Sequence, residues 1–99
     1  MPAAPASAPV MSRRAVAVVS GRVQGVGYRW FVRGRAEGAG VSGSATNRPD
    51  GRVEVVLEGA EDAVAAVLGV LDGPDAPGAV TRVDVRDEPA RGVRTFTTG

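Results

Sequence analysis

The sequence predicts an α+β domain in which two helices cover one face of an antiparallel sheet, in the order strand, helix, strand, strand, helix, strand. Two observations predict this class. Four segments are rich in valine or alternate between apolar and polar residues, as strands do, and turn residues separate them. Two further segments place apolar residues three or four positions apart, as amphipathic helices do. A split β-α-β sheet is the usual outcome of this order.

The first strand is predicted for residues 14–20, RAVAVVS, where a valine-rich run before Gly21 indicates a largely buried strand. The first helix is predicted for residues 28–39, with Gly40 as its stop. Its apolar positions have helical spacing: Tyr28, Phe31, Val32, Ala36 and Ala39.

The next two strands are predicted to form a hairpin. VSGSATN, residues 41–47, is the weaker strand, and it leads into RPDG, residues 48–51, which has proline at the second and glycine at the fourth position of a tight turn. RVEVVLE, residues 52–58, alternates valine or leucine with glutamate. We therefore expect it to pair back with one face in water.

The second helix is predicted within residues 59–73, because acidic residues stand at its start and Gly73 provides a stop. Its apolar stripe consists of Val64, Val67, Leu68 and Leu71. AVTRVDVRDE, residues 79–88, alternates again and supplies the last main strand. RTFTT, residues 94–98, is expected to add a short edge strand.

The chain is expected to hold one domain, residues 13–99, since about 100 residues is near the common domain size. Residues 1–12, MPAAPASAPVMS, contain three prolines within the first nine positions. That composition cannot form a continuous apolar leader and predicts a flexible tail. Met11 stands just ahead of the ordered pattern and is an alternative start of translation.

The composition limits the chemistry that the protein can perform. Histidine, cysteine and lysine are absent, all twelve basic residues are arginines, and Asn47 is the only asparagine. These absences exclude cysteine nucleophiles, serine–histidine relays, zinc sites and Schiff-base lysines. An enzyme with this composition works through arginine, carboxylates, hydroxyls and backbone amides, which favours positioning and charge stabilisation over proton transfer.

Charge and hydropathy indicate a soluble protein without a large surface region of one charge. The net charge is +1 and both signs are spread along the chain, which argues against binding to duplex DNA or to a membrane surface. Uninterrupted apolar runs such as Ala15–Val19 are far below the roughly 18 residues that span a bilayer. We expect a cytoplasmic monomer.

The segment SGRVQGVGYRWF, residues 20–31, joins the first strand to the first helix. Its glycines let a ligand approach the backbone N–H groups, and the helix start adds unpaired amides and the positive end of the helix dipole. Arg29, in the first helical turn, can donate two parallel hydrogen bonds to phosphate oxygens. The segment indicates a phosphate site, but glycines and an arginine here also suit an ordinary turn, and their spacing matches neither common nucleotide-binding motif.

Asn47 precedes the RPDG turn and has two interpretations. Its side chain can cap the turn, as asparagines often do. Alternatively, its strand pairs beside the first strand and brings the amide to the mouth of the loop. There its donor and acceptor would hold a water molecule without deprotonating it.

Three segments closely resemble the acylphosphatase family: VSGRVQGVGYR, GSATNRPDGRVEVVLEG and DGPDAPGAVTRVDV. The resemblance covers nearly everything after Arg13, and its first segment is highly specific. It implies a ferredoxin-like α/β sandwich that hydrolyses acyl phosphates to a carboxylate and inorganic phosphate without a metal or cofactor. By matching positions, it implies that Arg29 binds the phosphate and that Asn47 orients the water. It places the backbone-amide cradle at Arg22, Val23, Gln24, Gly25 and Val26.

Ser44 departs from the family pattern, which commonly has an aromatic residue at that position, and this predicts looser packing around the strand of Asn47. The departure is the best support for an alternative, a domain that has lost activity and only binds an anion or a partner. A related domain is also a module of larger carbamoyl-transfer maturation proteins, but the lack of cysteines and of a second domain favours the stand-alone form. RNA binding is a further alternative. It is disfavoured because three of the four aromatic residues, Tyr28, Trp30 and Phe31, lie at the first helix.

Overall fold

The computed structural model describes residues 12–99. Apart from Ser12, which begins the first strand, the tail expected at residues 1–12 lies outside the described residues. Each predicted helix and strand is present, and the predicted order is confirmed. The elements are β1 (Ser12–Arg22), α1 (Tyr28–Gly38), β2 (Ser42–Asn47), β3 (Val53–Ala60), α2 (Glu61–Leu68), β4 (Ala79–Glu88) and β5 (Phe96–Thr98).

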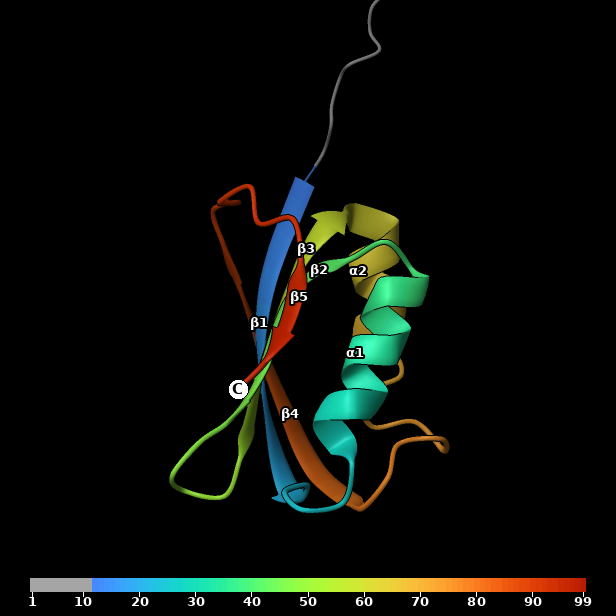
Figure 1. Ribbon diagram of the computed structural model, residues 1–99, viewed down its shortest axis with the longest axis vertical. Coiled ribbons are helices and arrows are strands. Elements are labelled where there is room, and N and C mark those ends of the chain that lie inside the picture. The colour runs from blue at the N-terminus through green and yellow to red at the C-terminus, as the bar shows by residue number, and fades with distance from the viewer. Residues whose placement is uncertain (1–11) are drawn as a thin grey trace, which may run out of the picture.

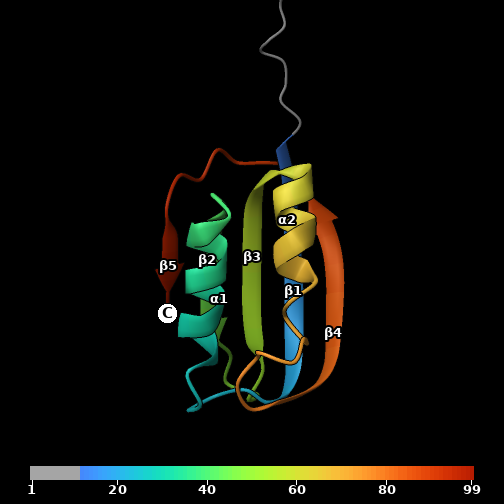
Figure 2. The same cartoon turned by 90° about the vertical axis from the view of Figure 1, so that its right-hand side faces the viewer.

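The strands form one sheet in the order β4-β1-β3-β2-β5. The pairs β4–β1, β1–β3 and β3–β2 are antiparallel, and the predicted hairpin of β2 and β3 is confirmed, whereas β5 runs parallel to β2 and makes the sheet mixed. The expectation that the strand of Asn47 pairs beside the first strand is wrong, because β3 lies between β1 and β2. The reason is the route of residues 89–95, which cross one end of the sheet from β4 to the far edge before β5 begins (Figures 1 and 2). A strand that arrives by a crossover can run parallel to its neighbour, which a tight hairpin does not allow.

Both helices pack on the same face of the sheet (Figure 2), so the α+β class with two helices on one face is confirmed. Helix α1 buries Tyr28, Val32 and Ala36, which are four residues apart and share one side of the helix. The sheet contributes alternate residues of its two central strands to the same core: Ala15, Ala17, Val19, Val53, Val55 and Leu57.

Helix α2 is shorter than predicted. It ends at Leu68 with Gly69 as its C-cap, although the apolar spacing continued to Leu71. Glycine is a poor helix former, and turns replace the helix after it. Leu71 is nevertheless fully buried, and its carbonyl accepts a hydrogen bond of 2.7 Å from the Tyr28 hydroxyl.

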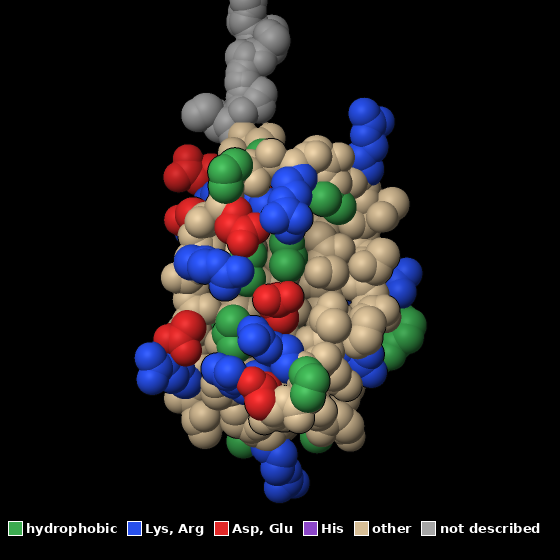
Figure 3. Space-filling view, turned by 90° about the vertical axis from the view of Figure 1, so that its left-hand side faces the viewer, with side chains coloured by type: hydrophobic (Ala, Val, Ile, Leu, Met, Phe, Trp, Pro, Cys, Tyr) green, Lys and Arg blue, Asp and Glu red, His purple; other side chains and the backbone are tan. Residues whose placement is uncertain are grey.

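The other face of the sheet is open, and Figure 3 shows it covered by side chains of both charges. Neighbouring charges pair locally, for example Arg82 with Asp84 at 2.8 Å and Arg86 with Glu88 at 3.1 Å. This face therefore presents no broad patch of one sign. Among the described residues, no helix has the length and apolar character needed to cross a bilayer.

Candidate active site

The loop that joins β1 to α1 turns through two glycines in the left-handed region, Gly25 with φ 75° and Gly27 with φ 85°. Gly27 is also the residue at which α1 begins, so this helix has no side-chain cap, and its first turn contains no acidic residue. The Phe31 N–H donates to the Gly27 carbonyl at 3.0 Å and closes the first turn. The N–H groups of the residues just before Phe31 have no acceptor within the helix. Unpaired donors at the start of a helix favour the binding of an anion.

Apolar side chains of residues 22–26, the predicted cradle, anchor this loop in the core. Val23 is 1 % exposed within the core, and Val26 is partly buried against it, whereas Arg22 and Gly25 are exposed. Within residues 12–99, no backbone N–H of residues 23–27 makes a well-formed hydrogen bond to another residue. The loop is thus fixed in place while its amides stay available, and Val23 and Val26 can contact a ligand through their backbone alone.

The side chain of Gln24 has a different task from the one predicted for the loop. Its Nε2 donates to the carbonyls of Arg48 and Arg52 at 2.8 and 3.0 Å. These two carbonyls belong to the turn between β2 and β3, so Gln24 ties the cradle to the hairpin that carries Asn47. A single glutamine in a loop gives no sequence indication of such a link.

Gly78, just before β4, is a second residue that sequence reasoning did not single out. A Cβ atom at this position would lie 2.0 Å from the Arg22 carbonyl oxygen and 2.9 Å from a methyl group of Val26. Only glycine permits this close approach, and its φ of 79° is also in the left-handed region. The chain at Gly78 therefore supports the cradle from the side of β4.

Arg29 lies in the first turn of α1, and its Nη1 donates at 2.6 Å to a main-chain oxygen of Gly99, the last residue of the sequence. The backbone N–H of Asn47 donates to the same oxygen at 3.2 Å, and the Gly99 N–H donates to Ala45 at 3.0 Å. Gly99 thus brings Arg29 and Asn47 together, although they lie on different elements.

Arg29 differs from the other two arginines of α1 in its partners. Arg33 pairs with Glu37 at 3.2 Å, and Arg35 pairs at 2.9 Å with Asp75, in the loop between α2 and β4. Arg29 has no side-chain carboxylate partner in the described part of the chain; its guanidinium contacts a main-chain oxygen of Gly99, the last residue of the sequence. Its other N–H groups remain available to an anionic ligand, whereas Arg33 and Arg35 are each paired with a side-chain carboxylate.

Asn47 ends β2 on the face covered by the helices, two residues beyond the fully buried Ala45. Its Oδ1 is buried and accepts no hydrogen bond from any described residue. The turn is instead capped by Asp50, whose carboxylate accepts the Arg52 N–H at 3.0 Å. The interpretation of Asn47 as the cap of the turn is therefore wrong, and its oxygen is free for a ligand or water.

Ser44 lies on the opposite face of β2 from Asn47, because successive strand residues alternate. It pairs with Val56 of β3, and the ladder continues without a break to Asn47, which pairs with Val53. The Ser44 side chain therefore points away from the face that carries Asn47, and the backbone pairing of the strand is continuous.

Tyr28 holds the start of α1 in place. It is 1 % exposed, its hydroxyl donates to the Leu71 carbonyl, and burial together with the charge of Asp72 raises its pKa well above the ordinary value. A neutral tyrosine fixed in this way anchors the backbone next to Arg29.

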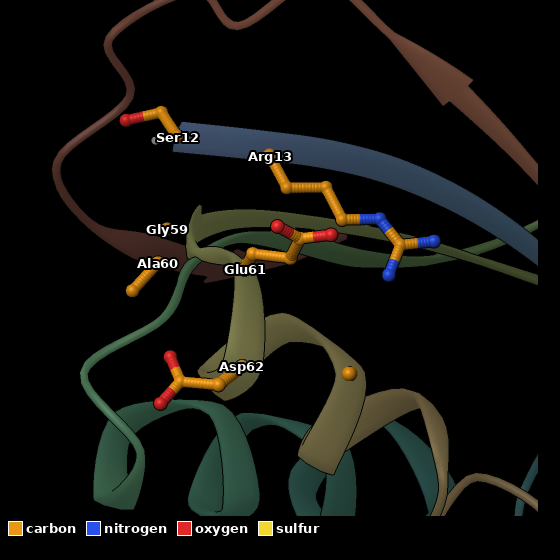
Figure 4. Close-up of a pocket in the computed structure, with 7 residues that line it drawn as sticks. Ser12, Arg13, Gly59, Ala60, Glu61 and Asp62 are labelled. Carbon is orange, nitrogen blue, oxygen red and sulfur yellow. The ribbon is translucent and has the colours of Figure 1, made fainter. Parts of the chain in front are cut away.

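A depression of about 580 Å³ lies at the other end of β1 (Figure 4). Arg13 and Glu61 lie beside each other in it, and none of the predicted site residues lines it. Arg13 is already paired with Asp87 at 2.9 Å, so the depression offers no unpaired arginine to an anion. The loop is the better candidate for an anion site than this depression, because the N–H groups of the loop have no partner. Within residues 12–99 no group of three carboxylates is placed to hold a metal ion.

Two helices on one face of a five-stranded sheet place the chain in the class of α+β sandwiches. The acylphosphatase family model matches residues 15–98, and the chain belongs to the acylphosphatase family.

Relatives and solved structures agree with this assignment. The chain is 51 % identical over 70 residues to an acylphosphatase of Mycobacterium sp. (strain JLS), covering 71 % of this chain and 74 % of the relative. It is 48 % identical over 86 residues to an acylphosphatase of Mycolicibacterium vanbaalenii, covering 85 % and 91 %. The crystal structure of acylphosphatase from Bacillus subtilis superposes with a TM-score of 0.81 at 34 % identity, covering 90 % of this chain and 99 % of that one.

These findings confirm the predicted family, the ferredoxin-like fold and the class of activity, the hydrolysis of acyl phosphates by a hydrolase. They do not favour the alternatives of an inactive anion-binding domain or an RNA-binding module.

Proposed function

We propose that Arg29, Asn47 and the amides of residues 22–26 carry out the hydrolysis of acyl phosphates in this chain. The guanidinium of Arg29 and the loop amides hold the phosphoryl oxygens, where their positive charge stabilises the transition state. The substrate is a small-molecule acyl phosphate, and the products are a carboxylate and inorganic phosphate.

Asn47 orients the attacking water on the side of phosphorus opposite the departing carboxylate. The water oxygen bonds to phosphorus while the bond between phosphorus and the acyl oxygen breaks, in line with the loose transition state of phosphoryl transfer. An amide cannot take up the proton of the water. We propose that this proton passes to a phosphoryl oxygen of the substrate.

The leaving group explains why a chain without histidine suffices. A departing carboxylate has a conjugate acid with a pKa of roughly 4, so it needs no general acid at neutral pH. The catalytic task is then positioning and charge stabilisation, which arginine and amides supply. We propose that the reaction needs neither a metal nor a cofactor.

The buried, unpartnered Oδ1 of Asn47 is the single observation that carries this proposal. A buried acceptor without a hydrogen bond costs roughly 1–3 kcal/mol, and such a cost is retained where a ligand satisfies the group. The backbone N–H of Asn47 and the guanidinium of Arg29 donate to the same Gly99 oxygen, which supports a common site for phosphate and water.

Steady-state hydrolysis of acetyl phosphate and benzoyl phosphate in EDTA tests the proposal, with the wild type beside Arg29→Ala and Asn47→Ala. We expect wild-type turnover to persist in the chelator and to be lost in both variants. Arg33→Ala is the matched control, since it removes an arginine from the same helix that is already paired. Turnover that stops in EDTA, or that survives both substitutions, would overturn the assigned roles.

We further propose that the protein acts as a cytoplasmic monomer without nucleic acid. The balanced charge and the locally paired arginines of the open face support this. Sedimentation at micromolar concentration, with and without RNA, should give one species of monomer mass.

A further inference from the structure

Glu58, on the open face of β3, is a buried carboxylate that the proposed reaction does not use. It is 5 % exposed and accepts hydrogen bonds from three successive backbone N–H groups, those of Arg91 at 3.1 Å, Gly92 at 2.6 Å and Val93 at 3.3 Å. These residues belong to the crossing between β4 and β5. A strand that alternates valine and glutamate predicts that this side chain lies in water, and the crossing covers it instead.

Arg14 of β1 completes the group. It is 7 % exposed, and it donates through Nη1 to Glu58 at 3.1 Å and through Nε to Glu88 at 3.0 Å. The three side chains lie side by side because Arg14 stands opposite Glu58 in one strand pair and opposite Glu88 in the other. A buried carboxylate with this arginine and three amides is fully satisfied, so it can stay ionised out of water.

Glu58 is the main polar attachment of the crossing to the sheet. Among the described residues, no backbone–backbone hydrogen bond connects residues 89–94 to another part of the chain. The next such bond comes at Thr95, whose carbonyl accepts from the Gly43 N–H at 2.9 Å. The position at which the crossing meets the sheet edge therefore depends on the Glu58 carboxylate.

The same segment ends at the candidate active site. β5 has only three residues, with Phe96 in the core, and Gly99 follows directly after it. The main-chain oxygen of Gly99 accepts from both the Arg29 guanidinium and the Asn47 backbone N–H. Figures 1 and 2 show the chain running from the crossing at one end of the sheet along β5 to the C label. A three-residue edge strand is too short to fix its own register firmly.

We propose that Glu58 is a positioning residue for the hydrolysis: by fixing residues 91–93 it sets the register of β5 and thereby places the Gly99 main-chain oxygen that orients Arg29. The inference rests on the proposed role of Arg29 in phosphate binding. Loss of the carboxylate lets the crossing and β5 shift together, and the guanidinium loses its orientation. Misplacement of a catalytic group by about 1 Å can cost about a hundredfold in rate.

Glu58→Gln tests the proposal, because it keeps the size of the side chain and removes its charge. We expect a folded variant with kcat/KM lower by roughly tenfold or more. Phosphate affinity, read from the fluorescence of Trp30, the only tryptophan and the neighbour of Arg29, should weaken in parallel. Glu61→Gln is the charge control, since it removes an exposed carboxylate of α2, and Val64→Ala is the stability control in the core. Both should keep the wild-type kinetics at a temperature where they are folded.

A double-substitution cycle separates positioning from general stability. If Glu58 acts through Arg29, Glu58→Gln should add nothing to the loss already caused by Arg29→Lys. Fold losses that multiply, or a folded Glu58→Gln with wild-type kcat/KM and phosphate affinity, would overturn the proposal. Full activity of an Arg29→Ala variant would instead refute the proposed role of Arg29, so the two failures are distinguishable.

A measurement on the unmodified protein covers the case in which Glu58→Gln does not fold. Coupling between two sites is reciprocal, so inorganic phosphate bound at Arg29 should slow amide hydrogen exchange at residues 91–93 and at Gly99 together. Protection confined to residues 23–30, with no change at residues 91–93, would contradict the coupling.

Discussion

The two ends of the sheet treat their polar groups in opposite ways. Where β1 runs into α1, the amides of residues 23–27 and the Oδ1 of Asn47 have no hydrogen-bond partner in residues 12–99, and Arg29 has no side-chain carboxylate partner there. At the other end, Arg14 and Glu58 are buried and paired with each other, and Glu58 also accepts backbone N–H bonds. Buried polar groups in proteins are normally satisfied, so the unsatisfied end is where a ligand is expected and the satisfied end is where structure is maintained.

The comparison also shows that the volume of a surface hollow does not by itself identify the binding site. The larger surface hollow lies near the satisfied end, whereas the proposed site is a shallow loop. A phosphoryl group is small and needs donors more than volume, so available N–H groups identify its site better than a cavity does.

The largest expected effect comes from removing the free charge. Arg29→Ala should lower kcat/KM on the order of 10²- to 10³-fold, the usual cost of losing one preorganised charge-stabilising group. It should also abolish most inorganic phosphate inhibition. Steady-state kinetics with acetyl phosphate measure both, and Arg35→Ala, whose charge is already paired, should stay near the wild type. Equal losses in the two variants would break the distinction between free and paired arginines.

Asn47 should give the next largest effect and a different pattern. Asn47→Ala should lower kcat on the order of 10²-fold with little change in phosphate affinity, because it removes the water ligand and keeps the cradle. Asn47→Asp keeps an acceptor but brings a negative charge to the phosphate, so it should also raise KM. If Asn47→Ala weakens phosphate binding as strongly as Arg29→Ala does, the division of roles is wrong.

Gln24 tests the comparison further, because it lies at the end with unpaired polar groups but its own side-chain amide is hydrogen-bonded. Gln24→Ala removes two hydrogen bonds to the hairpin and should cost about 1–3 kcal/mol of unfolding free energy. We expect KM to rise a few fold, since the cradle is no longer held against the turn. Urea unfolding and kinetics on the same samples measure the two effects, and an unchanged KM would show that the loop needs no such support.

The smallest expected effect is that of changing the pH between 6 and 8 on stability, and it concerns the satisfied end. Burial alone would raise the pKa of Glu58, but the amides of Arg91 and Gly92 and the Arg14 guanidinium outweigh it and hold the pKa below its ordinary value. The charged groups around it are Arg14, Glu88 and Arg91. A lowered pKa means stability that is present above the ordinary carboxyl value of about 4.3 and is lost as the pH falls through the folded value.

Urea unfolding of the wild type and of Glu58→Gln between pH 7 and pH 3 measures this contribution. The wild type should lose more stability than the variant on acidification, and the two curves should be parallel from pH 6 to pH 8. A wild-type curve that parallels the variant down to pH 3 would mean that the pairing adds no pH-dependent stability.

Local patterns were enough to predict most of the fold. Periodicity located both helices and the four main strands, because each segment buries one face. It missed the end of α2, since Gly69 stops the helix before the apolar spacing ends. It also missed the parallel direction of β5, which follows from the crossing of residues 89–95 to the far edge of the sheet.

The candidate site was predictable to a similar degree. Arg29, Asn47 and the loop follow from composition and from the family resemblance. The supporting roles of Gln24, Gly78 and Gly99 could not be predicted from the sequence. Each of these residues contacts a main-chain oxygen of, or offers one to, a segment far away in the sequence, and main-chain atoms carry no residue-specific pattern.

Amide NMR during a titration with inorganic phosphate tests the central claim most directly, because it compares both ends of the molecule in one experiment. The account predicts that the largest shifts fall on residues 23–30 and on the side-chain amide of Asn47. Much smaller shifts are predicted for residues 91–93, and none at Arg13 and Glu61. Largest shifts at the hollow beside Arg13, or equal shifts across the sheet, would contradict the claim that the unsatisfied end binds the phosphate.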